Sequence, residues 1–373
     1  MEPKPPRPTS YWDYIRVEEL LALQGGTAAS DAELTDDEVR FIVVHQVDEL
    51  WFKVVLRELA TARNLFARSR VPEDALAGAV QSLRRVTLCF ELAAQHFRLM
   101  ETMRTQDYLM FRDKLNPASG FQSAQMREIE ILLGLDDRDR IPLGNEGSYV
   151  DALKSHDGSP SPALRRVQRR QQDLPTLKQA VEAWLLRTPI HGSSPGDAGD
   201  DEKVESFVTS YLAGHEELYR RALLYAIRIQ AMTPADEERL RARYEGQLQG
   251  ARRHLRADDV PAERRREVRR LRAAILFVDS NRELPLLSWP GQVIDGLIEC
   301  EQAMLAFRQR HARMVERVIG RRIGTGGSDG VAYLDQTALK YRVFTEVWAA
   351  RTLLLPPDLC PPVERTFYGL VHE

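Results

Sequence analysis

The chain has 373 residues, 43% of them hydrophobic and 29% charged, which is enough to bury a large core in one domain or two. Its formal net charge of −3 excludes a general electrostatic attraction to nucleic acid or to anionic membranes. No apolar run approaches the roughly 20 residues that a membrane-spanning helix needs. The three cysteines are scattered without metal-binding spacing, which is typical of proteins from the reducing cytoplasm.

The first ten residues, MEPKPPRPTS, are rich in proline and in polar side chains. They lack the apolar core of a signal peptide, so residues 1–10 are interpreted as a flexible lead-in. Residues 11–373 are expected to form a single domain, and the protein is expected to be cytoplasmic.

The 3.6-residue period of helices dominates the sequence, and the alternation typical of strands is scarce. A long helix is expected to begin after Thr35, with three acidic residues in its first turn, and to end near Ala67. The Val-Pro pair at 71–72 interrupts the pattern, and a second long helix is expected from about Glu73 to Met103. Shorter helices are expected near 107–113, 121–134, 147–155 and 175–187.

The composition changes at residues 191–202, HGSSPGDAGDDE, which predict a loop or a disordered insertion within the domain. A turn is expected at residues 288–291, Ser-Trp-Pro-Gly, followed by a helix that ends at Ile319. The sequence contains no repeat of fixed period, and it predicts an all-α protein built around long helices. The other helices of this part of the chain are expected at 202–231, 234–256, 261–279 and 336–354.

The densest basic stretch is RRREVRRLR at residues 264–272. Three acidic residues lie close to it in the sequence, Asp258, Asp259 and Glu263. We interpret the stretch as a solvated helix face whose charge these acids counter, with nucleic-acid binding as the alternative.

The segment at 38–59, EVRFIVVHQVDELWFKVVLREL, is apolar on nearly every side and should be buried. Helical spacing places Phe41, His45 and Phe52 on one broad face, a suitable wall for a flat ligand. A histidine in such a helix is otherwise a core residue with its hydrogen bonds satisfied. The i, i+4 pair His45 and Glu49 could instead ligate a non-haem metal. That alternative is weakened because the sequence has no Glu-x-x-His motif and its histidines are dispersed.

Arg112 lies in a short aromatic stretch, next to Phe111 and four residues after Tyr108. A guanidinium in such surroundings is suited to a carboxylate, which it can bind through two parallel hydrogen bonds. The alternative is a structural salt bridge between Arg112 and an acidic residue of the protein.

The segment at 311–330, HARMVERVIGRRIGTGGSDG, joins a histidine in an amphipathic helix to a glycine-rich loop. His311 is a possible metal ligand, and the glycines allow the backbone to approach a small ligand closely. Thr325 and Ser328 could hold a polar group with their hydroxyls. The loop lacks the Lys-Ser/Thr ending of a P-loop, and its alternative interpretation is a helix cap followed by a tight turn.

These segments together resemble the tryptophan 2,3-dioxygenase family, and the similarity covers most of the chain in the same order. The motifs that carry the resemblance are YWDYIRVEELLALQ at 11–24, FIVVHQVDELWFK at 41–53, FRDKLNPASGFQSAQMREIE at 111–130, WLLRTP at 184–189 and FRQRHARMVERVIGRRIGTGGSDGVAYL at 307–334.

The resemblance implies an all-α haem protein in which long helices surround a haem b pocket. It implies that His311 is the proximal ligand of the haem iron, which is ferrous in the active state. It also implies that His45 is the distal histidine, which hydrogen-bonds the indole N–H of the substrate. Phe41 and Phe52 would then wall the distal pocket.

The resemblance also implies how an amino acid is held. Arg112 would pair with the carboxylate of L-tryptophan, Tyr108 would lie near that carboxylate, and Thr325 would contact the ammonium and carboxylate groups. In the implied reaction both atoms of dioxygen enter the indole C2–C3 bond and give N-formylkynurenine.

The family further implies a homotetramer, assembled as a dimer of dimers. In the family an N-terminal segment reaches into the active site of a neighbouring subunit, and Tyr11, Tyr14 and Ile15 match that segment.

The sequence departs from the family pattern at Asp329, where the glycine loop usually carries a second serine. This leaves the substrate open between plain tryptophan and a modified tryptophan, which a biosynthetic member of the family would oxidise, by mono-oxygenation or by ring cleavage. A non-catalytic haem sensor is the alternative from another class, because His311 alone would serve it.

Overall fold

The computed structural model describes residues 9–115, 122–142, 148–155, 157–229, 232–320, 322 and 330–369. In these ranges the regular structure is helical, apart from two isolated bridges that join Lys154 to Pro160 and Ile190 to Ser193. The all-α prediction is therefore confirmed. None of the helices in these ranges is both long and apolar enough to cross a membrane.

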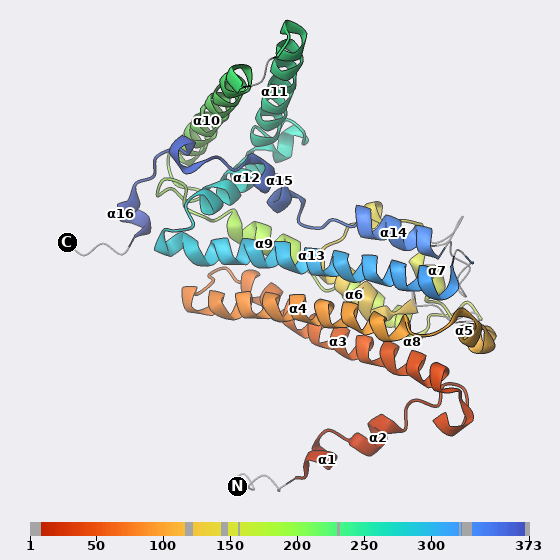
Figure 1. Ribbon diagram of the computed structural model, residues 1–373. Coiled ribbons are helices and arrows are strands. Elements are labelled where there is room, and N and C mark those ends of the chain that lie inside the picture. Colours follow the sequence, from red (N-terminus) through yellow and green to blue (C-terminus); the bar gives the residue numbers. More distant parts are fainter. Residues whose placement is uncertain are drawn as a thin grey trace, which may run out of the picture.

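Three long helices lie side by side at the centre of the molecule (Figure 1), namely α3 (Asp36–Phe66), α4 (Glu73–Met100) and α13 (Pro285–Ile319). The start of α3 was predicted because Thr35 caps it, accepting a hydrogen bond from the Glu38 N–H. The acidic residues of its first turn favour the positive end of the helix dipole. The facing sides of the three helices share one continuous apolar core.

Shorter helices follow α4 and pack against this centre, with α6 and α9 directly on α3. They confirm the short helices predicted in this part of the chain, and α8 was not predicted. Their bounds are Thr105–Phe111 for α5, Ala124–Leu133 for α6, Tyr149–Ala152 for α7, Pro162–Gln171 for α8 and Leu177–Leu185 for α9, with 3-10 turns at Arg112–Leu115 and Asp137–Asp139.

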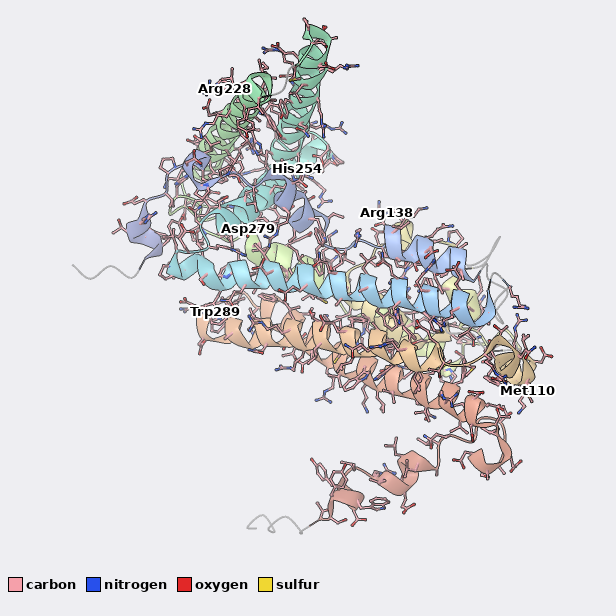
Figure 2. The ribbon with its side chains drawn as sticks, in the orientation of Figure 1. Met110, Arg138, Arg228, His254, Asp279 and Trp289 are labelled. Atoms are coloured by element: carbon pink, nitrogen blue, oxygen red, sulfur yellow. The ribbon has the colours of Figure 1, made fainter. Side chains whose placement is uncertain are left out.

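The helices α10 (Asp200–Ile229) and α11 (Pro234–Leu255) form a hairpin that projects from the body of the molecule (Figure 1). Polar side chains spread outward from this hairpin in Figure 2, where Arg228 marks the tip and His254 the base. The base rests on α12 (Arg265–Ser280), whose second half is buried. The last helices are α14 (Val331–Lys340), α15 (Thr345–Leu353) and α16 (Arg365–Tyr368).

The N-terminal segment lies apart from the body of the chain (Figure 1) and contains two short helices, α1 (Tyr11–Tyr14) and α2 (Val17–Leu21). Its connection to α3 is held by Gln46. The Gln46 side chain donates to the carbonyl oxygen of Leu23 at 2.8 Å and accepts from the side chain of Gln24, also at 2.8 Å.

The turn predicted at residues 288–291 is wrong, because α13 begins at Pro285 and continues through Pro290. Proline at the first position of a helix is favourable, whereas Pro290 removes one backbone hydrogen bond in the second turn. The burial of Leu287 and Val293 against the core offsets that loss.

The loop predicted at 191–202 is shorter and more firmly held than its composition indicates, since α10 begins at Asp200. Its anchor is Arg270 on α12. The Arg270 guanidinium donates to the Asp200 carboxylate at 2.9 Å and to the Ser193 carbonyl oxygen at 3.2 Å. It also donates to the carbonyl oxygens of Leu186 and Thr188, each at 3.1 Å.

The basic stretch at 264–272 is therefore only in part the solvated face that was predicted. Arg270 and Arg272 are buried, and Arg272 is bound by Asp259 and Glu346. Such pairing compensates the charge inside the protein, so these arginines join α12 to its neighbours rather than forming a basic surface.

We predict that Arg270→Met lowers the free energy of unfolding by about 3–5 kcal/mol, because it leaves a buried carboxylate and several carbonyl oxygens without their donor. Arg266→Met is the matched control. Arg266 also pairs with an aspartate, but its side chain is 74% exposed, against 7% for Arg270, so we expect a change of at most about 1 kcal/mol. Urea unfolding followed by circular dichroism measures both, and equal effects would contradict the assignment.

Candidate active site

His45 lies on α3, and the helix itself holds its ring. The Nδ1 atom of His45 lies 2.7 Å from the carbonyl oxygen of Phe41, one turn earlier. Because a carbonyl oxygen can only accept, Nδ1 carries the proton, and Nε2 of the neutral ring remains an acceptor. Burial lowers the pKa of His45, so the ring is neutral near pH 7. His45 therefore presents an acceptor atom in a defined orientation.

Aromatic rings surround His45 on the side of α5. The centroid of the Phe41 ring lies 4.1 Å from that of His45 and 5.7 Å from that of Phe111. The ring of Tyr108 lies 6.3 Å from Phe41 and 5.3 Å from Phe111. Tyr108 and Phe111 are both buried. The structure thus places Phe41 against His45 and Tyr108 next to Phe41.

Arg112 follows α5 directly and is half-buried. Its guanidinium hydrogen-bonds the side chain of Tyr108, one turn earlier, while burial raises the pKa of the Tyr108 phenol. Because Tyr108 packs against Phe41, this contact places a fixed positive charge at the edge of the aromatic group around His45. The arrangement is suited to a ligand with an anionic end and an apolar ring.

His311 lies on α13 and packs against α4. Its ring stacks on Phe97 with a centroid distance of 5.1 Å and an interplanar angle of 12°. Burial, the largest cause, together with the neighbouring His45 and Arg308 lowers the pKa of His311 to about 3. Packed rings join α13 to α3 here, since the Phe307 ring lies 6.3 Å from that of His311 and 5.7 Å from that of Phe52. The imidazole of His311, like that of His45, is neutral and has a lone pair available.

Phe52 shares the face of α3 that carries His45 but lies deeper in the core. Its ring packs edge-on against Phe307 at 5.7 Å and lies 6.3 Å from Phe90. Phe307 in turn lies 6.3 Å from His311. The structure therefore groups Phe52 with the aromatic residues beside His311, rather than with Phe41 and Tyr108.

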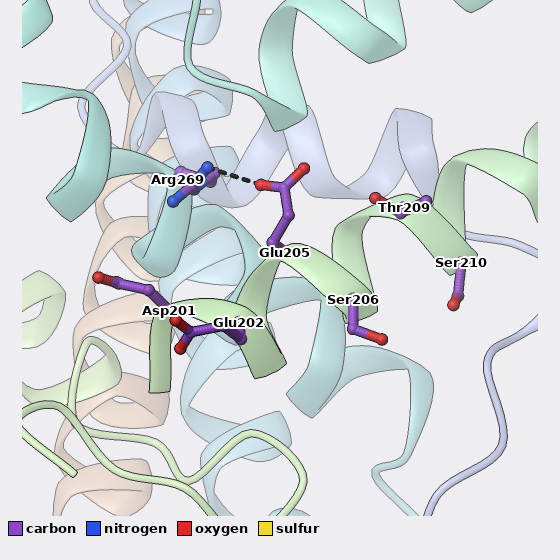
Figure 3. A pocket seen from close by; sticks show the side chains of 7 residues that line it. All are labelled: Asp201, Glu202, Glu205, Ser206, Thr209, Ser210 and Arg269. Atoms are coloured by element: carbon purple, nitrogen blue, oxygen red, sulfur yellow. Dashed lines mark hydrogen bonds and ion pairs between the residues drawn. The ribbon is translucent and has the colours of Figure 1, made fainter. Parts of the chain in front are cut away.

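A hollow of about 540 Å³ elsewhere on the molecule does not belong to this site. Figure 3 shows it on the surface of α10 and α12, where Glu205 faces Arg269 and accepts its hydrogen bond at 2.6 Å. The hollow is open and lined by charged and hydroxyl side chains, and neither histidine of the site lines it.

Comparison with known proteins places the chain in a family. A family model described as tryptophan 2,3-dioxygenase matches residues 6–354. The chain belongs to the tryptophan 2,3-dioxygenase family. A tryptophan 2,3-dioxygenase of Sorangium cellulosum is 57% identical over 98% of this chain and 88% of its own length. The tryptophan 2,3-dioxygenase 2 of Ralstonia nicotianae is 52% identical over 98% of this chain and 99% of its own length. The tryptophan 2,3-dioxygenase of Xenopus laevis is 33% identical over 96% of this chain and 86% of its own length.

The glycine loop of this family member lies between α13 and α14. Thr325 and Asp329 are outside the residues that the structure describes. On the α13 side Gly320 has a φ of 66°, and Arg322 donates to the carbonyl oxygen of Ile319 at 2.9 Å. The helix thus ends in a capped turn nine residues after His311, so α13 carries both the candidate ligand and the start of the loop.

The family's N-terminal segment is not brought to the site within a single chain. Tyr11 and Tyr14 are 76% and 78% exposed, and Ile15 and Trp12 are exposed beside them. Exposed apolar side chains that are this close together mark a contact surface.

The non-haem metal alternative loses its support in the structure. Glu49 is engaged by Gln125, whose side chain donates to the Glu49 carboxylate at 2.7 Å. Among the described residues, no three histidine, cysteine, aspartate or glutamate side chains are grouped to hold a metal ion. His45 and Glu49 therefore lack a third ligand in this part of the chain.

Sequence reasoning missed the role of two neighbours of the site. The sequence did not single out Phe97, yet its ring lies flat against His311. Nor did it single out Asp48, which is buried one turn after His45 and lies 3.5 Å from Nδ1 of His96. The available signal was helical spacing, since Asp48 falls on the same face as His45.

We predict that Asp48 makes stability depend on pH. Burial, and then the charge of Glu49, raises the pKa of Asp48 from 3.8 to about 7. A raised pKa contributes stability that is present below pH 3.8 and is lost as the pH rises to about 7, by up to about 4 kcal/mol. Asp48→Asn should therefore be more stable than the parent at pH 8 and nearly equal to it at pH 4. Urea midpoints at both pH values measure this, and the same difference at both would refute it.

Proposed function

We propose that this chain is a haem-dependent dioxygenase that inserts both atoms of dioxygen into the indole C2–C3 bond of L-tryptophan and gives N-formylkynurenine. The observation that carries the proposal is the pair of neutral imidazoles, with His311 held among aromatic rings on α13, and with His45 on α3 beside an aromatic group that carries an arginine and a tyrosine at its edge. The names of the two bacterial relatives agree with this activity. The expected compartment is the cytoplasm.

The residues around His311 fit a haem. The iron of a haem needs only one ligand from the protein, and His311 is a neutral imidazole with its lone pair free. The Phe97 ring holds the imidazole from one side, and Phe307 and Phe52 supply an apolar floor. When bound, haem b supplies ferrous iron that binds and activates dioxygen.

His45 is proposed to orient the substrate. Its Nε2 atom is the acceptor left free by the bond to Phe41, and an indole N–H is a donor. The hydrogen bond fixes the indole ring against the aromatic wall of Phe41, and such orientation is a large part of catalysis. His45 need not remove the proton, because an indole N–H is a very weak acid.

Arg112 is proposed to bind the substrate carboxylate, with Tyr108 beside it and Thr325 contacting the ammonium group. The hydrogen bond between Arg112 and the Tyr108 side chain sets the position of the guanidinium at the edge of the pocket. A planar guanidinium matches a carboxylate through two parallel hydrogen bonds, and the match is strongest away from bulk water.

The active assembly is proposed to be a homotetramer, a dimer of dimers, in which Tyr11, Tyr14 and Ile15 reach a neighbouring subunit's site. Their exposure in the single chain supports this, because a partner would cover them.

The proposed activity is tested by product mass. Purified protein reconstituted with ferrous haem and supplied with L-tryptophan under air should yield a product heavier by two oxygen atoms, and both should derive from labelled dioxygen. A product with one added oxygen, or turnover only of ring-substituted or N-methylated tryptophans, would replace this proposal with a biosynthetic role.

We predict that Arg112→Gln raises KM for L-tryptophan by about 10- to 150-fold, because a charge-assisted hydrogen bond is worth roughly 1.5–3 kcal/mol. Lys114→Gln is the matched control two residues later, since the half-exposed Lys114 pairs with the buried Glu38. Steady-state kinetics should show little change for this control. An unchanged KM in Arg112→Gln, with haem still bound, would favour a haem sensor that has no amino-acid site.

A further inference from the structure

A buried cluster of charges joins α6 to the part of α13 that carries His311, and it is not used in the proposed reaction. At its centre is Glu130 of α6, which is fully buried and bound by three arginines. The distances from Glu130 oxygens to guanidinium nitrogens are 3.0 Å for Arg127, 2.5 Å for Arg140 and 2.5 Å for Arg308. The three arginines come from α6, from the segment after it and from α13, and all are buried.

The positive charges of this cluster outnumber the negative ones. Besides Glu130, the carboxylate that pairs with it among the described residues is Asp137, which contacts Arg140 at 2.8 Å and is 67% exposed. The other neighbours are tyrosine rings. Arg308 lies over the ring of Tyr341, a phenol whose pKa burial raises to about 12, so it adds no negative charge.

The cluster also has unused donors. The Nε atoms of Arg127 and Arg308 and the Nη2 atom of Arg140 are buried with no hydrogen-bond partner in the part of the chain that the structure describes. A guanidinium without full pairing keeps more of its field than one enclosed by carboxylates, because little opposite charge lies near it.

Arg308 connects the cluster to the candidate haem ligand. It precedes His311 by three residues on α13, so the two side chains are neighbours on one helix face. Arg310 is different, since it pairs with Glu101 at 2.8 Å and its side chain is 39% exposed, against 9% for Arg308, so water screens its charge.

We propose that the excess positive charge of the Glu130 cluster, delivered through Arg308, raises the reduction potential of the haem iron and keeps it ferrous. Ferric haem carries one more positive charge than ferrous haem, so a nearby buried cation destabilises the ferric state more. Charges and hydrogen bonds around an axial ligand are established means of tuning such potentials. The inference rests on the proposed ligation of haem by His311. Arg308 is here a positioning and tuning residue rather than a catalytic one.

The test uses two variants that change the charge of the cluster in opposite directions, each purified with haem bound. Arg308→Gln removes a positive charge, and Glu130→Gln removes the negative one. At a fixed ambient potential, we expect the ferric to ferrous ratio to rise about tenfold in Arg308→Gln and to fall about tenfold in Glu130→Gln. Tenfold corresponds to about 59 mV for a one-electron couple. Spectroelectrochemical titration with mediator dyes measures both midpoints.

The opposite signs of the two shifts distinguish an electrostatic effect from a general loss of packing. If the cluster only holds α6 to α13, the midpoint potential should move in the same direction in both variants or stay unchanged in both. Either result would overturn the inference. Arg308→Lys keeps the charge but not the fork of donors, so its potential should stay near the parent value. If Arg308→Gln fails to fold, the other two variants still test the inference. Glu130→Gln should raise the midpoint potential, whereas Arg308→Lys should leave it unchanged.

The control outside the pocket is Arg272→Gln. Arg272 of α12 is as buried as Arg308 and is bound by Asp259 and Glu346, so its loss should lower the unfolding midpoint without moving the potential. Haem content is measured first from the Soret band, which should be lost or shifted in His311→Ala. If the parent protein binds no haem, the proposed function fails. If it binds haem and the Arg308 and Glu130 variants do not move the potential in opposite directions, only this inference fails.

Discussion

Two imidazoles, His45 on α3 and His311 on α13, are central to the proposed chemistry, which requires both to stay neutral. A charged imidazole at either position would lose its hydration, so burial lowers the pKa of each. Neutrality leaves a lone pair on each ring, one for iron and one for the indole N–H. The packing of α3 and α4 on α13, which buries the rings, therefore also sets their chemistry.

The charged groups of the proposed site surround the two neutral imidazoles. Arg112 is fixed by Tyr108 at the end where a carboxylate would lie. The Glu130 cluster reaches α13 through Arg308, three residues before His311, and contains more guanidinium than carboxylate. Positive potential favours the carboxylate end of the substrate, and it favours ferrous over ferric iron, so the two groups of arginines act in the same sense in a low-dielectric interior.

The helices were predictable because their signals are local. The period of apolar residues and the capping side chain of Thr35 predicted the position of α3, and Gly320 predicted the end of α13. The errors arose where tertiary contacts override local preference. Pro290 remains helical because its neighbours are buried, and the loop before α10 is held by Arg270, a residue 70 positions from its partner Asp200.

The candidate site divides in the same way. The proximity of Phe41 to His45, and of Tyr108 to Arg112, follows from helical spacing along one or two adjacent elements. Spacing cannot tell which of two packed helices a residue will face, so Phe52 was expected beside Phe41 and instead packs on Phe307. The Glu130 cluster was invisible in the sequence because its arginines come from α6, from the segment after it and from α13.

Gln46 of α3 connects the N-terminal segment, on which the proposed assembly depends, to the helix that carries His45. Gln46 holds the carbonyl of Leu23 and the side chain of Gln24, and it directly follows His45. The helix that aims the proposed acceptor at the substrate therefore also anchors the exposed Tyr11 and Tyr14 at the end of the arm. A partner that covers those tyrosines would restrain the arm, and through Gln46 it would stabilise the same turn of α3 that orients His45. Displacing this N-terminal segment should for that reason disturb the site of the neighbouring subunit, which it is proposed to reach, and also the site of its own chain.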